Sequence, residues 1–167
     1  METSRVRKMY DYHVWANHQV IEHLKQLPDS IFHQPITSVF STISEVMVHL
    51  YVTDIIYLLT LKGVHYDDVL KIIDEQKSQL EGADIAAVEK AYHKLSEDYY
   101  QFLNLHQNLE GTIKAEHPRY GKTEFVMADI LHHVINHGTY HRGNITAMLH
   151  QQGEKGVPTD YIYHIFS

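Results

Sequence analysis

One segment near the C-terminus constrains the fold of this chain most, because it predicts a long helix with histidines on its core-facing side. Core-facing residues of a helix recur in steps of three and four. Here these steps run through Ile130, Val134, His137, His141, Ile145 and Met148. His137 and His141 therefore lie one helical turn apart and point in the same direction.

Two interpretations of this pair stay open. Buried imidazoles need partners for their ring nitrogens, because an unpaired polar group in an apolar interior is costly. Neighbouring side chains or carbonyls could satisfy each histidine separately. Alternatively, the pair binds one metal ion, since neutral imidazole is a common ligand of divalent metals. That interpretation requires a third ligand from elsewhere in the chain.

The composition limits the class of protein. With 167 residues, 44% hydrophobic and 21% charged, the chain is expected to form one soluble domain over residues 1–167. It has no apolar run of roughly 18 residues and no signal-peptide core, so we expect a cytoplasmic protein with no membrane partner. The formal net charge of −7 argues against a nucleic-acid partner. The absence of cysteine excludes disulfides, zinc–thiolate sites and a catalytic thiol of its own.

Hydrophobic periodicity predicts four long helices. They span residues 4–27, 38–61, 85–109 and 127–152, with a loop at 28–37 and Asp84 as the cap of the third helix. Residues 63–82 are long enough to cross the end of a bundle, with a short helix at 67–80, so helices two and three need not be antiparallel neighbours. The predicted fold class is all-α, a four-helix bundle with a long crossover between helices two and three.

His49 is the best-placed candidate for the third ligand, because it lies on the inner side of the second helix, three residues after Val46. His133, one turn before His137, is the main competitor. Three histidines of one helix do not easily converge, since His133 to His141 spans about 12 Å at about 1.5 Å per residue. We therefore predict His49, His137 and His141 as the ligands and place His133 beside them or in packing.

Other features of the sequence, outside the three predicted ligands, also lead to structural predictions. Asn17 interrupts the apolar stripe of the first helix and is expected to be a buried polar group with a partner. Trp15 lies off that stripe. A packed surface, a subunit interface or a substrate contact would explain its position. Residues 112–126 fit a small hairpin or a plain loop. The tail at 158–163 is apolar enough to pack back on the bundle.

Two glycines inside the last helix also require an explanation. Gly138 and Gly143 each cost about 1 kcal/mol relative to alanine at an interior helix position. The close approach of another backbone or of a ligand would explain why glycine stands there.

Motifs of other enzyme classes are absent from the sequence. The His137/His141 spacing is that of a zincin, but the glutamate that follows the first histidine of a zincin is missing. There are no Glu-x-x-His pairs of the ferritin-like di-iron type and no glycine-rich nucleotide loop. No nucleophile elbow is present either.

Three motifs resemble those of the DinB/YfiT-like superfamily, and the resemblance covers most of the chain. They are Tyr12-x-x-Trp15-Ala16-Asn17, Val48-His49-Leu50 after a serine-rich entry to the second helix, and His133-x-x-Asn136-His137-Gly138-x-Tyr140-His141-Arg142-Gly143-x-Ile145. The last motif looks like the C-terminal signature of the family. It departs from that signature at Asn144, where glutamine is usual.

The resemblance implies a four-helix bundle with a long crossover, often a homodimer. It also implies one divalent metal ion, held by one histidine of helix two and two of helix four, at the positions of His49, His137 and His141. We expect zinc or nickel ahead of iron, although histidine nitrogen suits all three. Family members include transferases that use bacillithiol, mycothiol or glutathione. The implied function is therefore a metal-dependent thiol S-transferase whose partners are a small electrophile and a low-molecular-weight thiol.

Other functions and residue roles stay open at this point. Three histidines with vacant coordination positions are typical of a catalytic metal site. A metal-dependent hydrolase could use the same positions, and a metal-binding bundle protein without turnover would have the same ligands. Arg142, next to His141, either orients an anionic group of the thiol or makes a structural salt bridge.

Overall fold

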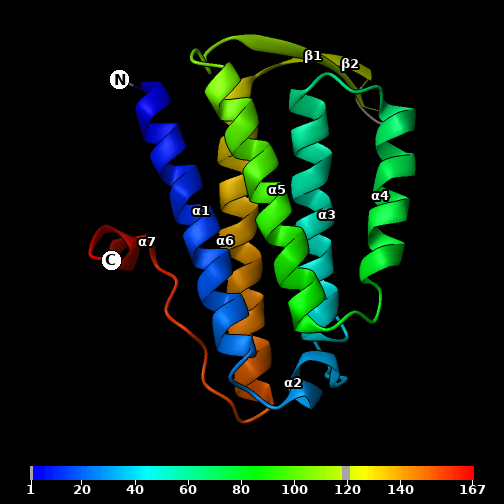
Figure 1. Cartoon of the computed structure of the whole chain (residues 1–167), viewed down its shortest axis with the longest axis vertical. Coiled ribbons are helices and arrows are strands. Elements are labelled where there is room, and N and C mark those ends of the chain that lie inside the picture. The colour runs from blue at the N-terminus through cyan, green and yellow to red at the C-terminus, as the bar shows by residue number, and fades with distance from the viewer. Residues whose placement is uncertain (1, 118–120) are drawn as a thin grey trace.

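A computed structural model describes residues 2–117 and 121–167 (Figure 1). The helices are α1 (Glu2–Leu24), α2 (Asp29–His33), α3 (Ile43–Leu61), α4 (Tyr66–Leu80), α5 (Ile85–Leu105), α6 (Met127–Gln151) and α7 (Tyr161–Ile165), and the strands are β1 (Thr112–His117) and β2 (Gly121–Val126). Figure 1 shows α1, α3, α5 and α6 along the long axis of the molecule, with α4 outside α3 and the hairpin across one end.

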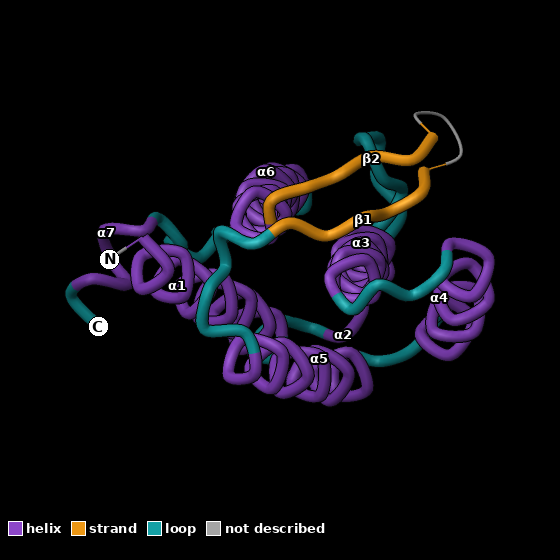
Figure 2. The backbone as a smooth tube through the Cα atoms, turned by 90° about the horizontal axis from the view of Figure 1, so that it is seen from above, coloured by secondary structure: helices purple, strands orange, loops and turns teal. Residues whose placement is uncertain are grey.

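The four long helices pack as a bundle, in which α1 and α3 each contact both α5 and α6 (Figure 2). α3 and α5 run in the same direction, from the end that carries α2 to the end that carries the hairpin (Figure 1). Parallel neighbours need a return segment, and α4 provides it. The predicted four-helix bundle with a long crossover is therefore confirmed.

Local capping residues set where the helices begin. Asp84 accepts a hydrogen bond from the backbone N–H of Ala87, so the predicted cap of α5 is confirmed. Thr42 accepts from the N–H of Glu45, and the Glu45 carboxylate accepts from the N–H of Ser41. These two hydrogen bonds start α3 at Ile43, so the predicted start at residue 38 was too early.

Other boundaries also differ from the prediction. The predicted loop at 28–37 contains α2, whose Ile31 and Phe32 are buried against the core. α5 ends at Leu105 rather than 109, because His106 leaves the helical conformation at φ −112° and ψ 88°. Beyond it, the Asn108 side chain accepts from the N–H of Glu110 in a turn. Thr112–His117 and Gly121–Val126 pair as an antiparallel hairpin, so the plain loop is excluded. Residues 118–120, between the two strands, lie outside the described residues.

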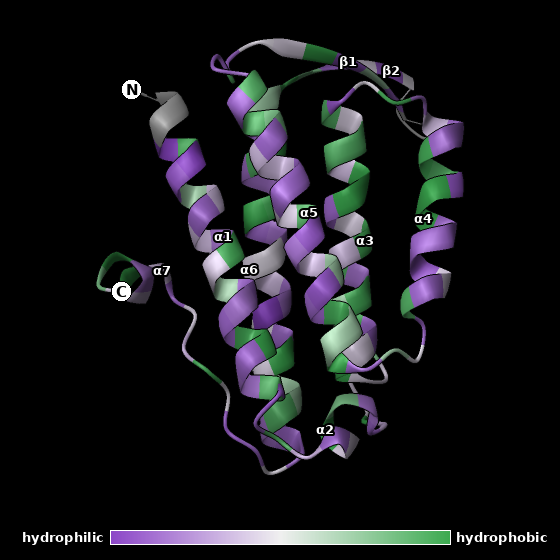
Figure 3. Ribbon diagram, in the orientation of Figure 1, coloured by the Kyte–Doolittle hydropathy of each residue, from purple (hydrophilic) through white to green (hydrophobic). Residues whose placement is uncertain are grey.

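The core is centred on α3, which is buried on more than one side, as predicted. Figure 3 shows hydrophobic residues along the whole of α3, whereas α1 and α5 also carry polar faces. Within the described residues, α3 alone is long and apolar enough to span a membrane, and 56% of that stretch is buried inside the bundle. This burial is typical of the core helix of a bundle.

Candidate metal centre

α3 and α6 bring the three predicted histidines together. Nε2 of His49 lies 3.2 Å from Nε2 of His137, and Nε2 of His141 lies 3.1 Å from the same atom. All three ligand atoms lie within 4.8 Å of one another. α6 contributes two of them because His137 and His141 are one turn apart, and α3 packs beside α6 with His49 on the facing side.

The spacing of these nitrogens fits one metal ion. At a metal–nitrogen distance of about 2.0–2.1 Å, two ligands of a tetrahedral ion lie about 3.3 Å apart. A ring proton between two of the nitrogens points to one neighbour at a time, whereas one cation binds all three lone pairs at once. His49, His137 and His141 could therefore hold a divalent metal.

Burial keeps these imidazoles neutral. It is the largest influence on the pKa of His137, which it lowers from 6.5 to about 4, and the charges of His141 and His49 lower it further. Burial likewise lowers the pKa of His49 and of His141. All three rings are therefore uncharged near pH 7, which is the protonation state that a metal ligand requires.

Aromatic rings surround the centre. The Phe40 ring lies 5.0 Å from the His49 ring and 5.5 Å from the His141 ring, between centroids. His133 is exposed and stacks on His137 at 5.7 Å between ring centroids, and its ring also lies 4.5 Å from the Tyr57 ring. His133 therefore packs beside the cluster and is not one of its members, as predicted.

A cavity opens beside His49. Its volume is about 540 Å³, and it lies between the first turns of α3 and the end of α4. His49, Phe40 and Val48 line one side, and Lys77 and Glu81 line the other. A small organic molecule in this cavity would therefore lie against the histidine centre and also meet charged groups.

Asn144 contacts the centre from outside. Its side-chain nitrogen Nδ2 lies 3.2 Å from Nδ1 of His141, the ring nitrogen that faces away from the other two histidines. The sequence had marked Asn144 only as a departure from the family signature. Its i+3 spacing from His141 was the available signal, because residues three apart are neighbours on a helix surface.

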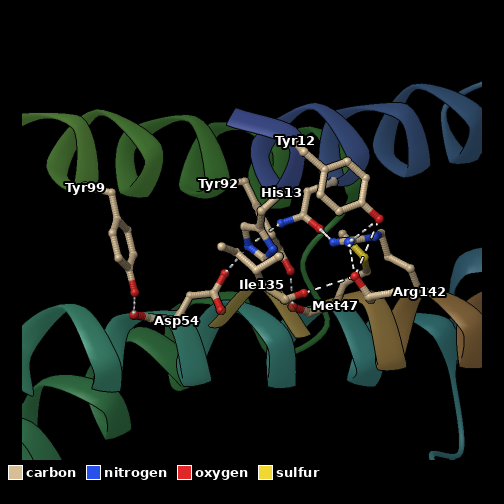
Figure 4. A network of polar contacts seen from close by, with 10 residues as sticks. Tyr12, His13, Met47, Asp54, Tyr92, Tyr99, Ile135 and Arg142 are labelled. Carbon is tan, nitrogen blue, oxygen red and sulfur yellow. Dashed lines mark hydrogen bonds and ion pairs between the residues drawn. The ribbon is translucent and has the colours of Figure 1, made fainter. Parts of the chain in front are cut away.

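A second polar cluster, buried except for Thr139, lies between α1, α3 and α6, and we call it the arginine network (Figure 4). Its members are Tyr12, His13, Asn17, Asp54, Thr139 and Arg142. Arg142, which is 2% exposed, donates through Nη1 to Asn17 Oδ1 at 2.8 Å. Through Nη2 it donates to Thr139 Oγ1 at 3.0 Å and to the Tyr12 hydroxyl at 3.4 Å.

These contacts correct both predicted roles of Arg142. None of the acceptors described for it is a carboxylate, so the predicted salt bridge is wrong. Its burial also removes the guanidinium from any exogenous thiol. Burial lowers its pKa, while the hydrogen bond to Tyr12 and the charge of Asp54 raise it. Arg142 therefore joins helices rather than meeting a substrate.

The other end of the arginine network is a histidine–aspartate pair. Nε2 of His13 lies 2.9 Å from Asp54 Oδ2 and 3.1 Å from Asn17 Nδ2. Asn17 therefore has buried partners, as predicted. The His13–Asp54 pair was not predicted, because α1 and α3 meet there through residues 41 positions apart.

Gly138 is explained by this network. A Cβ atom at Gly138 would lie 2.5 Å from Cε1 of His13 and 2.8 Å from Nη1 of Arg142. A close approach does explain this glycine, but the side chains of His13 and Arg142 make it rather than the predicted backbone or ligand. A Cβ at Gly143 would meet nothing within 4 Å, so close approach does not explain that position.

The C-terminal segment packs on α1, as predicted for the tail. The Tyr12 hydroxyl donates to the carbonyl of Thr159 at 2.9 Å, and the Tyr12 and Tyr161 rings lie 5.2 Å apart. Trp15 is half-buried, and its ring lies 5.3 Å from the ring of His164 in α7. A packed surface within one chain therefore explains Trp15.

A further group with metal-ligand spacing lies on the surface. It consists of His18, Glu22 and Glu89. The Lys25 ammonium is 2.7 Å from Glu22 and 3.0 Å from Glu89, so both carboxylates already have a cation. Half-exposed surface carboxylates with such a partner do not indicate a metal site.

The fold and the histidine centre together define a class, namely a helical-bundle protein with a candidate three-histidine metal site. The chain belongs to the DinB family, which matches residues 1–167. It is 42% identical over 159 residues to the protein named DinB of Bacillus subtilis (strain 168), and the match covers 95% of this chain and 92% of that protein. The family resemblance of the three sequence motifs is therefore confirmed.

Proposed function

We propose that His49, His137 and His141 bind one divalent metal ion and that the protein is a metal-dependent thiol S-transferase. The convergence of the three Nε2 atoms beside a cavity carries this proposal. Three neutral nitrogens leave coordination positions free, as in catalytic rather than structural sites. Zinc or nickel is the proposed ion, ahead of iron, because a site of imidazole nitrogens generally binds Ni²⁺ and Zn²⁺ more tightly than Fe²⁺.

The bound ion would supply positive charge beside sulfur, which favours the thiolate form of a low-molecular-weight thiol. The residues of the chain orient the reactants. His49 joins the ion to the cavity wall, and Phe40 covers one side of the centre. Because the chain has no cysteine, the nucleophile is the exogenous thiol, and a small electrophile occupies the cavity.

Location and oligomeric state complete the proposal. The acidic charge of −7 supports a cytoplasmic protein that binds neither nucleic acid nor membrane. We also propose a homodimer. Apolar side chains on and after α7 support it, since Ile162, Tyr163 and Phe166 are 51%, 50% and 81% exposed. A sedimentation mass near 19.5 kDa at micromolar concentration would show a monomer instead.

The test is a conjugation assay on untagged protein purified without chelator. Metal content is measured first, and then the rate of thiol addition to small electrophiles is followed with and without metal. The transferase predicts conjugation that needs both metal and thiol. Chelation should abolish that rate, and the ion should restore it.

Two other outcomes identify the alternative functions. A metal-dependent hydrolase would use the same free positions to activate water. It would cleave esters or amides at a rate that does not depend on thiol. A bundle protein without turnover would take up metal and accelerate none of these reactions.

A further inference from the structure

The contact between Asn144 and His141 distinguishes one ligand of the centre from the other two. Among the residues that the structure describes, His141 is the only ligand with a side-chain hydrogen bond at Nδ1. Nδ1 of His137 is buried without a partner. Asn144 is half-buried and lies three residues beyond His141 on α6.

The protonation state of a metal-bound histidine determines what its partner must be. A neutral imidazole that binds metal through Nε2 carries its proton on Nδ1, which then needs an acceptor. In the structure the amide nitrogen of Asn144 faces His141 Nδ1, and a nitrogen with two hydrogens cannot accept that proton. This orientation leaves the His141 proton on Nε2, among the other histidines.

Rotation of the Asn144 carboxamide by about 180° around its Cβ–Cγ bond resolves this conflict. The oxygen and nitrogen of an amide have nearly the same shape, so they exchange places without moving any other atom. We infer that the Asn144 carboxamide oxygen accepts the Nδ1–H of His141 in the metal-binding form, which makes Asn144 a positioning residue for this ligand. The inference rests on the proposed metal site and assigns a role to Asn144 within it.

The amide of Asn144 also determines how strongly His141 donates its Nε2 lone pair to the metal. A carboxylate at the same place would accept the Nδ1 proton more strongly and make Nε2 of His141 a better donor to the metal. A neutral amide holds the ring in position but leaves more positive charge on the ion. That is the property that a centre binding a thiolate requires.

Two substitutions of Asn144 distinguish whether the oxygen or the nitrogen of its carboxamide must face Nδ1 of His141. Asn144→Ala removes the acceptor, and we expect metal affinity to fall about 10- to 100-fold. Asn144→Asp leaves only acceptor oxygens, so we expect affinity at or above that of the wild type. If the amide nitrogen were the functional group, a carboxylate facing the lone pair of Nδ1 would weaken binding as much as alanine does.

Affinity is measured for zinc by competition with a chromophoric chelator, after circular dichroism has shown that each variant is folded. Asn104, exposed near the end of α5, provides matched controls through Asn104→Ala and Asn104→Asp. Both controls should bind zinc as the wild type does. Unchanged affinity in Asn144→Ala, or equal losses in Asn144→Ala and Asn144→Asp, would overturn the inference.

A second measurement does not require metal. In metal-free Asn144→Asp, long-range ¹H–¹⁵N correlation of the histidine rings should place the proton of His141 on Nδ1. A proton on Nε2 in that variant would overturn the inference. If the wild type binds no zinc, the proposed metal site fails, whereas zinc binding that is insensitive to Asn144 defeats the inference alone.

Discussion

The histidine centre and the arginine network are both polar clusters built on α6, but their atoms are arranged in opposite ways. In the arginine network, donors face acceptors, as Arg142 faces the oxygens of Asn17 and Thr139. In the histidine centre, three atoms of the same kind face one another. The first arrangement pairs most of its polar atoms within the chain, although His13 Nδ1, Asp54 Oδ1 and Arg142 Nε have no partner. The second requires a cation to bring its lone pairs together.

The difference shows how one helix serves two purposes. His141 and Arg142 are adjacent in the sequence, and the helical turn of about 100° per residue sends them to different clusters. The arginine network joins α1, α3 and α6 and so fixes the distance between the helices that carry the ligands. We expect substitutions in the histidine centre to abolish metal binding, and substitutions in the arginine network to lower the free energy of unfolding.

The largest expected effect is on metal affinity. His137→Ala should weaken zinc binding on the order of 1,000-fold or more, because two ligands replace three. His132→Ala removes an exposed histidine of the same helix and is the matched control. Competition with a chromophoric chelator measures both. Full zinc occupancy in His137→Ala would show that the ion lies elsewhere.

Arg142→Ala should destabilise the metal-free protein by about 3 kcal/mol, because it removes the charged donor of the hydrogen bonds to Asn17 and Thr139. Urea unfolding measures this change, with Arg5→Ala, which removes an exposed arginine of α1, as the control. Arg142→Lys should recover only part of the loss, since an ammonium lacks the forked geometry of the guanidinium. A free energy of unfolding equal to that of the wild type would show that the network does not stabilise the bundle.

The two glycines of α6 form a matched pair. Gly138→Ala should destabilise by about 1–3 kcal/mol, because the new Cβ meets His13 and Arg142. Gly143→Ala, where space is open, should stabilise the helix by up to about 1 kcal/mol. Thermal unfolding of both variants tests this. Changes of the same sign would contradict the packing described around Gly138.

The smallest effect is a dependence of stability on pH in the metal-free protein. The pKa of His137 is lowered to about 4, so between pH 6.5 and about 4 the unfolded chain binds more protons there than the folded chain. The contribution of neutral His137 to the free energy of unfolding should therefore be fully present above pH 6.5 and be lost as the pH falls toward 4. Urea unfolding at several pH values should show a weaker dependence in His137→Gln. An equal dependence in both proteins would contradict the assigned cause.

The sequence predicted the histidine centre better than the arginine network, for a physical reason. His137 and His141 interrupt an apolar stripe that is visible within one short segment, so two ligands could be predicted from that segment alone. His49 was predicted from its position on the core-facing side of α3. The network depends on contacts between distant positions, such as Arg142 with Asn17, which are 125 residues apart. Asn17 was recognised as polar and buried, but its partners were not.

Helix boundaries show the same limit. The predicted helices continued past the C-terminal end of α5 and began before α3, because apolar residues at helical spacing also occur in the adjoining turns. The boundaries depend on single residues, such as the backbone conformation of His106 and the hydrogen bond of Glu45. Asp84 was predicted correctly because its capping role needs only the residues that follow it.

The central claim is that one metal ion lies between three histidines, and anomalous X-ray diffraction at the zinc edge tests it most directly. Crystals of zinc-loaded protein should show one anomalous peak about 2.0–2.1 Å from Nε2 of His49, His137 and His141. A principal peak at His18, Glu22 and Glu89, or no peak at the three histidines in zinc-saturated crystals, would contradict the account.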